Sequence, residues 1–305
     1  MKHLKITTAE IAKICGVSQG TVDRALNNRP DIKAETKLKI LDVAKKYGYR
    51  DTINEVSDAQ RELVGIVVFN LNNEYFSNLI TELEYVLGQH NLSTVVMMSH
   101  YDKLREAECI RMLYNMGVKG IIICPVNAGK EFENYLSLYD LPIVCVGNRI
   151  PSLPYVGIDD FLEMRDMTLE AIKNDYEDII YFSPALNYAD ASAQRLRYEG
   201  FLSAIGNTIF SCVTDISEIQ QKYPRKTIII CSNDYYALKV FFKGTNAKIT
   251  GFDNIKTISD YHLPIDTVEY SISEIAKNAT DVILGNKDDS VIIRHYIAEN
   301  NTNII

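Results

Sequence analysis

The sequence lacks the markers of several large protein classes. Its 305 residues contain no apolar run near the ~20 residues that a membrane helix needs. Residues 1–16 show neither the apolar core nor the small-residue cleavage site of a signal peptide. We therefore expect a soluble, cytoplasmic protein that makes no contact with a membrane.

Patterns for metals, disulfides and catalysis are also missing. The six cysteines form no C-x-x-C pair and mostly lie in aliphatic stretches such as IIICP, which is typical of buried thiols. The five histidines show no metal-ligand spacing. No nucleophile elbow, G-x-x-x-x-G-K-[ST] or G-x-G-x-x-G motif occurs. We predict no metal, no cofactor and no enzymatic activity.

The net charge of −8 is unevenly distributed along the chain. Residues 1–50 contain eleven Lys/Arg and five Asp/Glu, a formal charge of +6, so the remainder carries −14. A basic segment attracts a polyanion, whereas phosphate would repel the acidic remainder. The length favours about two domains. We predict a DNA-binding headpiece at 1–50, a linker at 51–62 and a second domain at 63–305.

Residues 1–50 have the pattern of three short helices. The first, TTAEIAKIC, can be capped by Thr7 or Thr8, and Gly16 is suited to a left-handed helix end. Its inner face would hold Ile11, Ala12 and Ile14. The second, QGTVDRALNN, follows Ser18, and the third would bury Leu38, Ile40, Leu41 and Ala44. This order predicts a helix-turn-helix, whose second helix enters the major groove of DNA.

Polar side chains of the second helix are candidates for DNA contacts. Base edges could be read by Gln19, Gly20, Thr21 and Arg24. Phosphates, which fix position rather than sequence, could be bound by Thr7, Ser18, Asn27 and Lys33. The alternative is the solvated face of an ordinary three-helix bundle, which the local charge of +6 disfavours.

From residue 63 onward, short aliphatic runs alternate with segments of helical spacing. LVGIVVF, STVVMM, KGIIIC and LPIVCVG form one series, and a second begins at EDIIYFS. This repetition predicts an α/β fold with parallel sheets covered by helices. Ligands of such sheets bind beyond the carboxyl ends of the strands. There the chain places NLNNEYF, GNR, SND and GFDN, whose amides and charges suit a sugar or similar polar molecule.

Two purely structural roles could also explain these polar residues. An Asn or Asp after a strand is often only a helix cap. Arg197 and Asp253 could form a structural ion pair. The coincidence of several polar strand ends favours a site.

The first segment resembles the headpiece of the lactose-repressor (LacI/GalR) family. The similarity covers ITTAEIAKICGVSQGTVDRALNNRPDIKAETKLKILDVAKKYGYR, some 45 residues. It implies that Gln19, Gly20, Thr21 and Arg24 read the bases. After GY the family continues P-N-x-x-A-[RQ]-x-L, a hinge helix that wedges into the minor groove, whereas this chain has RDTINEVSDAQRELVG. We therefore expect no normal hinge helix, and weaker or differently oriented DNA binding.

Residues 63–300 are similar to the two-lobed, type I periplasmic-binding-protein fold of the same family. The markers are NEYF, LPIVCVGNR, VGIDD, SAQRLRYEGF, CSNDYYAL and GFDN. The resemblance implies ligand contacts from Asn73, Tyr75, Phe76, Asn148, Arg149, Arg197, Asn233 and Asp253. Where many members have Gln in T-V-x-Q, this chain has Tyr270, which we expect to be a ninth ligand contact with a phenol in place of an amide. We expect the chain to cross between the lobes near 159, 268 and 288.

Together these features predict a transcriptional regulator, with repression as the first expectation. Two copies would pair through the acidic domain and bind a pseudo-palindromic operator, and a small effector would alter operator affinity. A free sugar is the first expectation for the effector. A phosphorylated sugar or nucleoside fits if Arg149 and Arg197 face an anion, and a neutral polyol fits if Arg197 pairs with Asp253. The alternative function is a solute-binding protein without regulatory DNA binding.

Overall fold

The computed structural model describes residues 6–26, 29, 32–47, 49, 62–186, 192–287 and 289–300. The chain divides into two compact units, Met1–Arg61 and Glu62–Ile305. We call them the headpiece and the body and describe each by itself. The predicted linker, apart from Glu62, and the predicted phosphate contact Asn27 lie outside the described residues.

The headpiece contains α1 (Thr8–Cys15), α2 (Gln19–Leu26) and α3 (Ala34–Lys46). Thr7 caps α1 in a reciprocal capping box with Glu10. Gly16 ends α1 with φ 72°, a left-handed conformation that glycine adopts at little cost. The small core comprises Ile11, Ala12, Cys15, Val22, Ala25, Ile40 and Ala44.

Two residues predicted to lie in this core are instead exposed. Ile14 is 47% exposed and Leu38 is 67% exposed. At about 100° per residue, the face shared by Ile11 and Cys15 leaves Ile14 beyond its edge. Leu38 lies about 200° from Ile40 and therefore on the far side of α3. Each of these short helices buries only two or three residues, so its buried face is narrower than the apolar pattern of the sequence implies.

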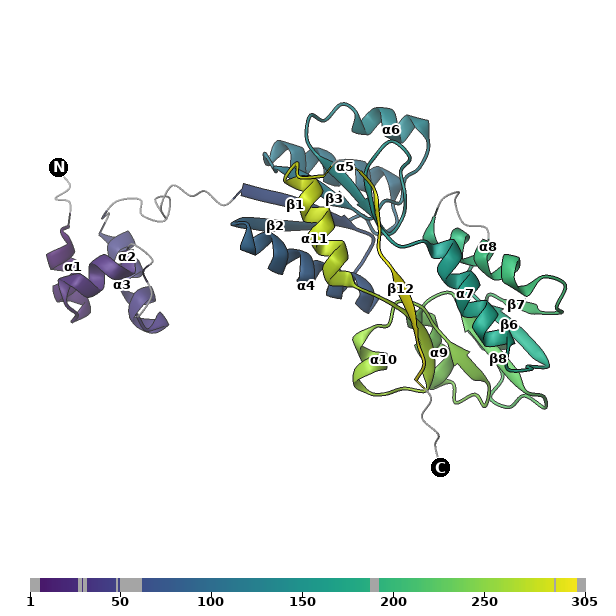
Figure 1. Ribbon diagram of the computed structural model, residues 1–305. Coiled ribbons are helices and arrows are strands. Elements are labelled where there is room, and N and C mark those ends of the chain that lie inside the picture. Colours follow the sequence, from purple (N-terminus) through teal and green to yellow (C-terminus); the bar gives the residue numbers. More distant parts are fainter. Residues whose placement is uncertain are drawn as a thin grey trace. The chain divides into compact units, whose positions relative to one another are not determined.

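The first lobe of the body is a six-stranded parallel sheet in the order β11-β5-β4-β3-β1-β2. Figure 1 labels β1, β2 and β3 of this sheet. Its strands are β1 (Glu62–Val68), β2 (Leu92–Met98), β3 (Gly120–Ile123), β4 (Ile143–Val146), β5 (Tyr155–Gly157) and β11 (Val291–Ile292). Helices α4 (Glu74–Gln89) and α11 (Ile272–Ile283) lie side by side and pack on one face. Helices α5 (Lys103–Asn115) and α6 (Lys130–Leu136) pack on the other. Both faces are buried, which explains the nearly continuous aliphatic strands.

The second lobe has the strand order β12-β10-β9-β8-β6-β7. Its strands are β6 (Asp178–Phe182), β7 (Ser211–Val213), β8 (Thr227–Cys231), β9 (Lys248–Thr250), β10 (Ile265–Tyr270) and β12 (His295–Ala298), and β12 runs antiparallel to β10. Its helices are α7 (Asp160–Ile172), α8 (Ala193–Ile205), α9 (Asp234–Phe242), α10 (Lys256–Asp260) and the 3₁₀ turn η1 (Ile216–Glu218). Helices α7 and α8 lie side by side (Figure 1). A methyl group at Gly200 of α8 would lie 2.2 Å from the carbonyl oxygen of Phe161.

The chain crosses between the lobes at three places. The first lies at 158–159, between β5 and α7, and the second at Ser271, between β10 and α11. The third lies at 293–294, later than the predicted position near 288, because Val291–Ile292 first pairs with β5. The predicted α/β class, with a three-helix headpiece and a two-lobed body, is confirmed. Within the described ranges, every helix is too short or too polar to cross a membrane.

Candidate functional site

A cavity of about 360 Å³ lies between the two lobes of the body. Eight of the nine residues predicted as ligand contacts line it: Asn73, Tyr75, Phe76, Asn148, Arg197, Asn233, Asp253 and Tyr270. They come from both lobes: from the loops and helix starts that follow β1, β4, β8 and β9, from within α8, and from the end of β10. The strand-end rule therefore brings together residues that lie almost 200 positions apart in the sequence.

Two of the lining asparagines also cap helices. Asn73 Oδ1 accepts a hydrogen bond from the backbone N–H of Tyr75 at 3.1 Å, at the start of α4. Asn233 Oδ1 accepts one from the backbone N–H of Tyr236 at 3.1 Å, at the start of α9. In both cases the cap uses the oxygen of the amide, so the NH₂ group remains to donate to a ligand. Capping and ligand contact are compatible at both positions.

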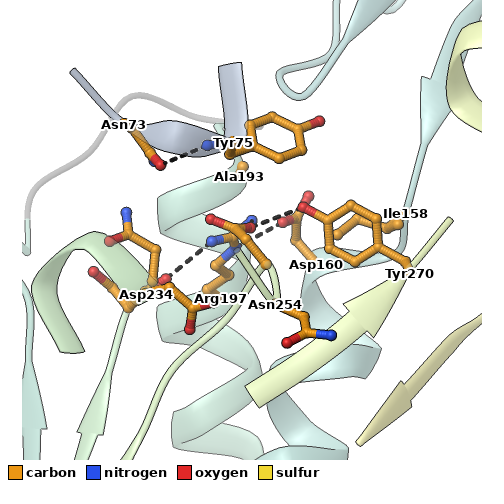
Figure 2. A network of polar contacts seen from close by, with 12 residues as sticks. Asn73, Tyr75, Ile158, Asp160, Ala193, Arg197, Asp234, Asn254 and Tyr270 are labelled. Carbon is orange, nitrogen blue, oxygen red and sulfur yellow. Dashed lines mark hydrogen bonds and ion pairs between the residues drawn. The ribbon is translucent and has the colours of Figure 1, made fainter. Parts of the chain in front are cut away.

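A buried arginine of the cavity lining, Arg197, lies within a network of polar contacts (Figure 2). Arg197 Nε donates to Asp160 Oδ1 at 2.8 Å, and Nη2 donates to Asp253 Oδ1 at 3.2 Å. Nη1 donates to the carbonyl oxygen of Ser232 at 3.0 Å. Tyr270 donates its hydroxyl to the same Asp253 oxygen at 2.8 Å. The Arg197–Asp253 ion pair thus exists, and both of its members also line the cavity.

Burial dominates the electrostatics of this wall. It raises the pKa of both Asp160 and Asp253, while the Arg197 guanidinium acts to lower each. For Arg197 itself, burial opposes the charge, but Asp253 and Asp160 raise its pKa, so the guanidinium is a cation at every relevant pH. Burial also raises the pKa of Tyr270 well above its usual value, so this phenol is neutral and can donate.

Arg149, the ninth predicted contact, does not line the cavity. Its Nη2 donates to the carbonyl oxygen of Ile158 at 3.0 Å, and its guanidinium lies 4.3 Å from the centre of the Tyr155 ring. Only one of the two arginines predicted to face a common anion therefore reaches the cavity. Tyr155 does line the cavity, and its ring makes a cation–π contact with the Arg149 guanidinium.

Sequence reasoning missed several lining residues. They include Phe69, Tyr101, Tyr155, Asp160, Gln194 and Tyr236. Asp160 could have been found, because it ends the VGIDD segment at the first lobe crossing. Tyr101 gives no such signal: it follows β2 with φ 62°, and its ring stacks on that of Phe69 at 5.1 Å. The missed aromatics give the cavity apolar faces in addition to the polar strand ends.

Direct hydrogen bonds join the lobes beside the cavity. Glu74 of α4 accepts hydrogen bonds from both the backbone N–H and the hydroxyl of Thr257 in α10. Asn148 Oδ1 accepts one from the backbone N–H of Ala193 in α8 at 2.9 Å. Each bond pairs a carbonyl or carboxylate of the first lobe with a helix start of the second. They depend on the lobes being close together.

The headpiece presents most of the predicted DNA contacts on its surface. Thr7, Ser18, Gln19, Gly20 and Arg24 are exposed, and Thr21 is half-buried. Within the headpiece Gln19 Nε2 donates to the hydroxyl of Thr8 at 2.9 Å, and Arg24 Nε donates to the carbonyl oxygen of Gly20 at 3.1 Å. The face of α2 that carries them is opposite to its buried Val22 and Ala25.

Two family descriptions match the chain over consecutive segments. "Bacterial regulatory proteins, lacI family" matches residues 7–52, and "Periplasmic binding proteins and sugar binding domain of LacI family" matches residues 61–258. The second segment alone covers more than half of the chain. The protein belongs to the lacI family of bacterial regulatory proteins.

Relatives and solved structures agree with this assignment. The sucrose operon repressor of Pediococcus pentosaceus is 24% identical over 304 residues, 92% of each chain. The lac repressor dimer bound to operator and the anti-inducer ONPF has a TM-score of 0.66 at 15% identity, covering 96% of this chain and 98% of that one. Cra from Pseudomonas putida, in complex with fructose 1-phosphate, has a TM-score of 0.67 at 13% identity, covering 79% and 99%. At these identities the structures show a common fold. As a lacI-family member the protein is a DNA-binding transcriptional regulator.

Proposed function

We propose that this regulator is a repressor whose operator affinity is set by a small polar molecule, in the first place a sugar, bound between the lobes. The observation that carries the proposal is the cavity itself, where amides, carboxylates and aromatic rings from both lobes converge. A sugar matches this lining, because its hydroxyls both donate and accept while its C–H faces pack on rings. The relative from P. pentosaceus is named a sucrose operon repressor, which supports the same class of ligand.

Control of DNA binding would act through closure of the lobes. Two hydrogen bonds, between Glu74 and Thr257 and between Asn148 and Ala193, form only when the lobes are close together. The closed state therefore has contacts that an open state would lack. A ligand that contacts both lobes binds this state better than an open one, and this differential affinity is what shifts the equilibrium. In a homodimer, closure would alter the spacing of two headpieces on a pseudo-palindromic operator. Such a regulator works on DNA in the cytoplasm and needs no catalysis.

For operator binding we propose the residues of α2 and its neighbours. Base edges would be read by Gln19, Gly20, Thr21 and Arg24, and phosphates bound by Thr7, Ser18 and Asn27. In the body, the proposed ligand contacts are the eight cavity-lining residues given above. Arg149 would act indirectly, by holding Tyr155 against the cavity.

The experiment selects operator duplexes from a random pool with the full-length protein and then measures affinity by anisotropy. Arg24→Ala should lower affinity for the selected duplex by about 5- to 150-fold, since one base contact contributes ~1–3 kcal/mol, and should flatten the sequence preference. The charge-matched Lys13→Ala, on the exposed face of α1, should keep that preference. A solute-binding protein without regulatory DNA binding would select no common sequence, and that result would refute the proposal.

A further inference from the structure

The charges that line the cavity are few and unbalanced. Among the described residues, the only charged side chains in the lining are Asp160, Arg197 and Asp253. Two carboxylates thus bracket one guanidinium, at 2.8 and 3.2 Å, and Arg149 lies outside the lining. The wall carries one net negative charge when all three groups are ionised. An anionic ligand would meet no uncommitted cation there.

Arg197 is already occupied on its edge and on one face. Three of its five N–H groups donate to Asp160, Ser232 and Asp253, and its carbon Cζ lies 3.6 Å from the centre of the Phe252 ring. Bidentate binding of a phosphate needs two parallel N–H groups on one edge of a guanidinium. The two N–H groups that remain are one on Nη1 and one on Nη2. A phosphate bound there would lie beside the carboxylate of Asp253, which accepts from the same Nη2, and like charges repel each other.

The hydrogen-bonding groups of the cavity point to the same class of ligand. Gln194 Oε1 is buried, lies in the lining residue set and has no hydrogen-bond partner among the described residues. It is an acceptor, as are the carboxylates of Asp160 and Asp253, so the ligand must bring donors. Asn73 and Asn233 keep their NH₂ groups and therefore need acceptors. Hydroxyl groups satisfy both needs, whereas the oxygens of a phosphate dianion only accept.

We propose that the cavity selects an uncharged, hydroxyl-bearing ligand over its phosphorylated counterpart, and that Asp160 and Asp253 set this preference. The inference rests on the proposed function, because it names the ligand class of the same cavity. Tyr270 supports the selection by donating to Asp253 and so helping to hold that carboxylate in place. The rings of Tyr75, Phe76 and Tyr101 provide the faces on which the C–H groups of such a ligand pack.

The test uses matched pairs of compounds with the full-length protein. Fructose and fructose 1-phosphate, glucose and glucose 6-phosphate, and sucrose and sucrose 6-phosphate are screened by thermal shift, and each hit is titrated by calorimetry. We expect at least one uncharged member to bind, with its phosphorylated partner at least 100-fold weaker. If a phosphorylated member binds as tightly as its partner or tighter, the charge selection is wrong while the proposed function stands. If no member of any pair binds, the sugar-controlled function fails and the inference with it.

Two variants locate the selection. Asp253→Asn and Asp160→Asn each remove one negative charge and keep the shape, so each should narrow the ratio of the two affinities at least tenfold. Asp159→Asn is the control: it removes a neighbouring charge from the N-cap of α7 but does not line the cavity, and Asn is an equally good cap. Its ratio should stay within about threefold of the original. An unchanged ratio in both cavity variants, with the binding of the uncharged compound retained, would assign the preference to other residues and overturn the proposal.

Discussion

Replacing Glu163 by Gln should make the protein more resistant to alkaline pH. Glu163 lies on α7 with its side chain fully buried, and neither carboxylate oxygen has a hydrogen-bond partner among the described residues. Burial raises the pKa of this carboxyl to about 9, with Asp160 adding to the effect. The group that faces it from β12 is His295, whose Nδ1 lies 3.4 Å from Oε1. The folded protein therefore carries this carboxyl in its protonated form at neutral pH.

The sign and size of the effect follow from proton linkage. The unfolded chain loses the Glu163 proton near pH 4.5 and the folded chain near pH 9, so between these values the folded state holds more protons. The contribution of Glu163 to the free energy of unfolding is then largest below pH 4.5 and falls by about 1.4 kcal/mol per pH unit as the pH rises toward 9. Gln has no proton to lose. From pH 6 to 8 the variant should gain up to about 3 kcal/mol relative to the parent, or roughly 5–11 °C in Tm.

The assay is thermal unfolding of both proteins at pH 6, 7 and 8 at constant ionic strength. Asp234, whose pKa burial raises to about 7, also lowers stability with rising pH, but it is present in both proteins and cancels in the difference. Glu170→Gln, on the same helix and 40% exposed in an ion pair with Lys173, is the control and should track the parent. Parallel curves for the parent and Glu163→Gln would mean that Glu163 ionises alike in the folded and unfolded states, and would refute the reasoning.

Two further predictions concern packing and closure. Glu74→Ala removes the carboxylate that accepts two hydrogen bonds from Thr257 of α10 in the other lobe. It should weaken ligand binding about 3- to 10-fold in calorimetry, as expected for the loss of one or two hydrogen bonds. An unchanged affinity would mean that these bonds do not contribute to closure. Gly200→Ala places a methyl 2.2 Å from the Phe161 carbonyl oxygen and should destabilise the body by ~1–3 kcal/mol in urea unfolding. A urea midpoint equal to that of the parent would mean that α7 and α8 can move apart at no cost in free energy.

Much of the fold could be predicted because its signals are local. The Thr7 cap and the left-handed Gly16 are encoded within one or two helical turns, and the alternation of aliphatic runs and helices fixes the α/β class. The errors at Ile14 and Leu38 arise where a three-helix core is too small to bury every apolar residue of its helices. The local pattern predicts whether a segment is a helix or a strand, while tertiary packing decides which of its apolar residues are buried.

Only part of the candidate site could be predicted from the local sequence, and the rest depends on tertiary contacts. Asn73 and Asn233 were predictable as cavity-lining residues because each follows the carboxyl end of a parallel strand, β1 in one lobe and β8 in the other. Arg149 follows a strand in the same manner, yet the Tyr155 ring and the Ile158 carbonyl hold it away from the cavity. Gln194 lies in the first turn of α8, two residues after Ser192, where the described residues resume, and its exposure to the cavity depends on how α8 packs. Side-chain direction at the cavity is set by such contacts, which spacing in the sequence does not encode.

The start of α4 provides a physical link between the proposed ligand binding and closure of the lobes. Asn73 caps the helix with its oxygen and keeps an NH₂ group for the cavity, Glu74 reaches Thr257 of the other lobe, and Tyr75 lines the cavity with its ring. Three consecutive residues at one helix end therefore contact, in turn, the helix itself, the opposite lobe and the cavity. A ligand that fixes Tyr75 and the Asn73 amide also fixes the backbone from which Glu74 projects. With the ligand that we propose, occupancy and closure would stabilise each other, because each would remove conformational freedom that the other would otherwise have to remove.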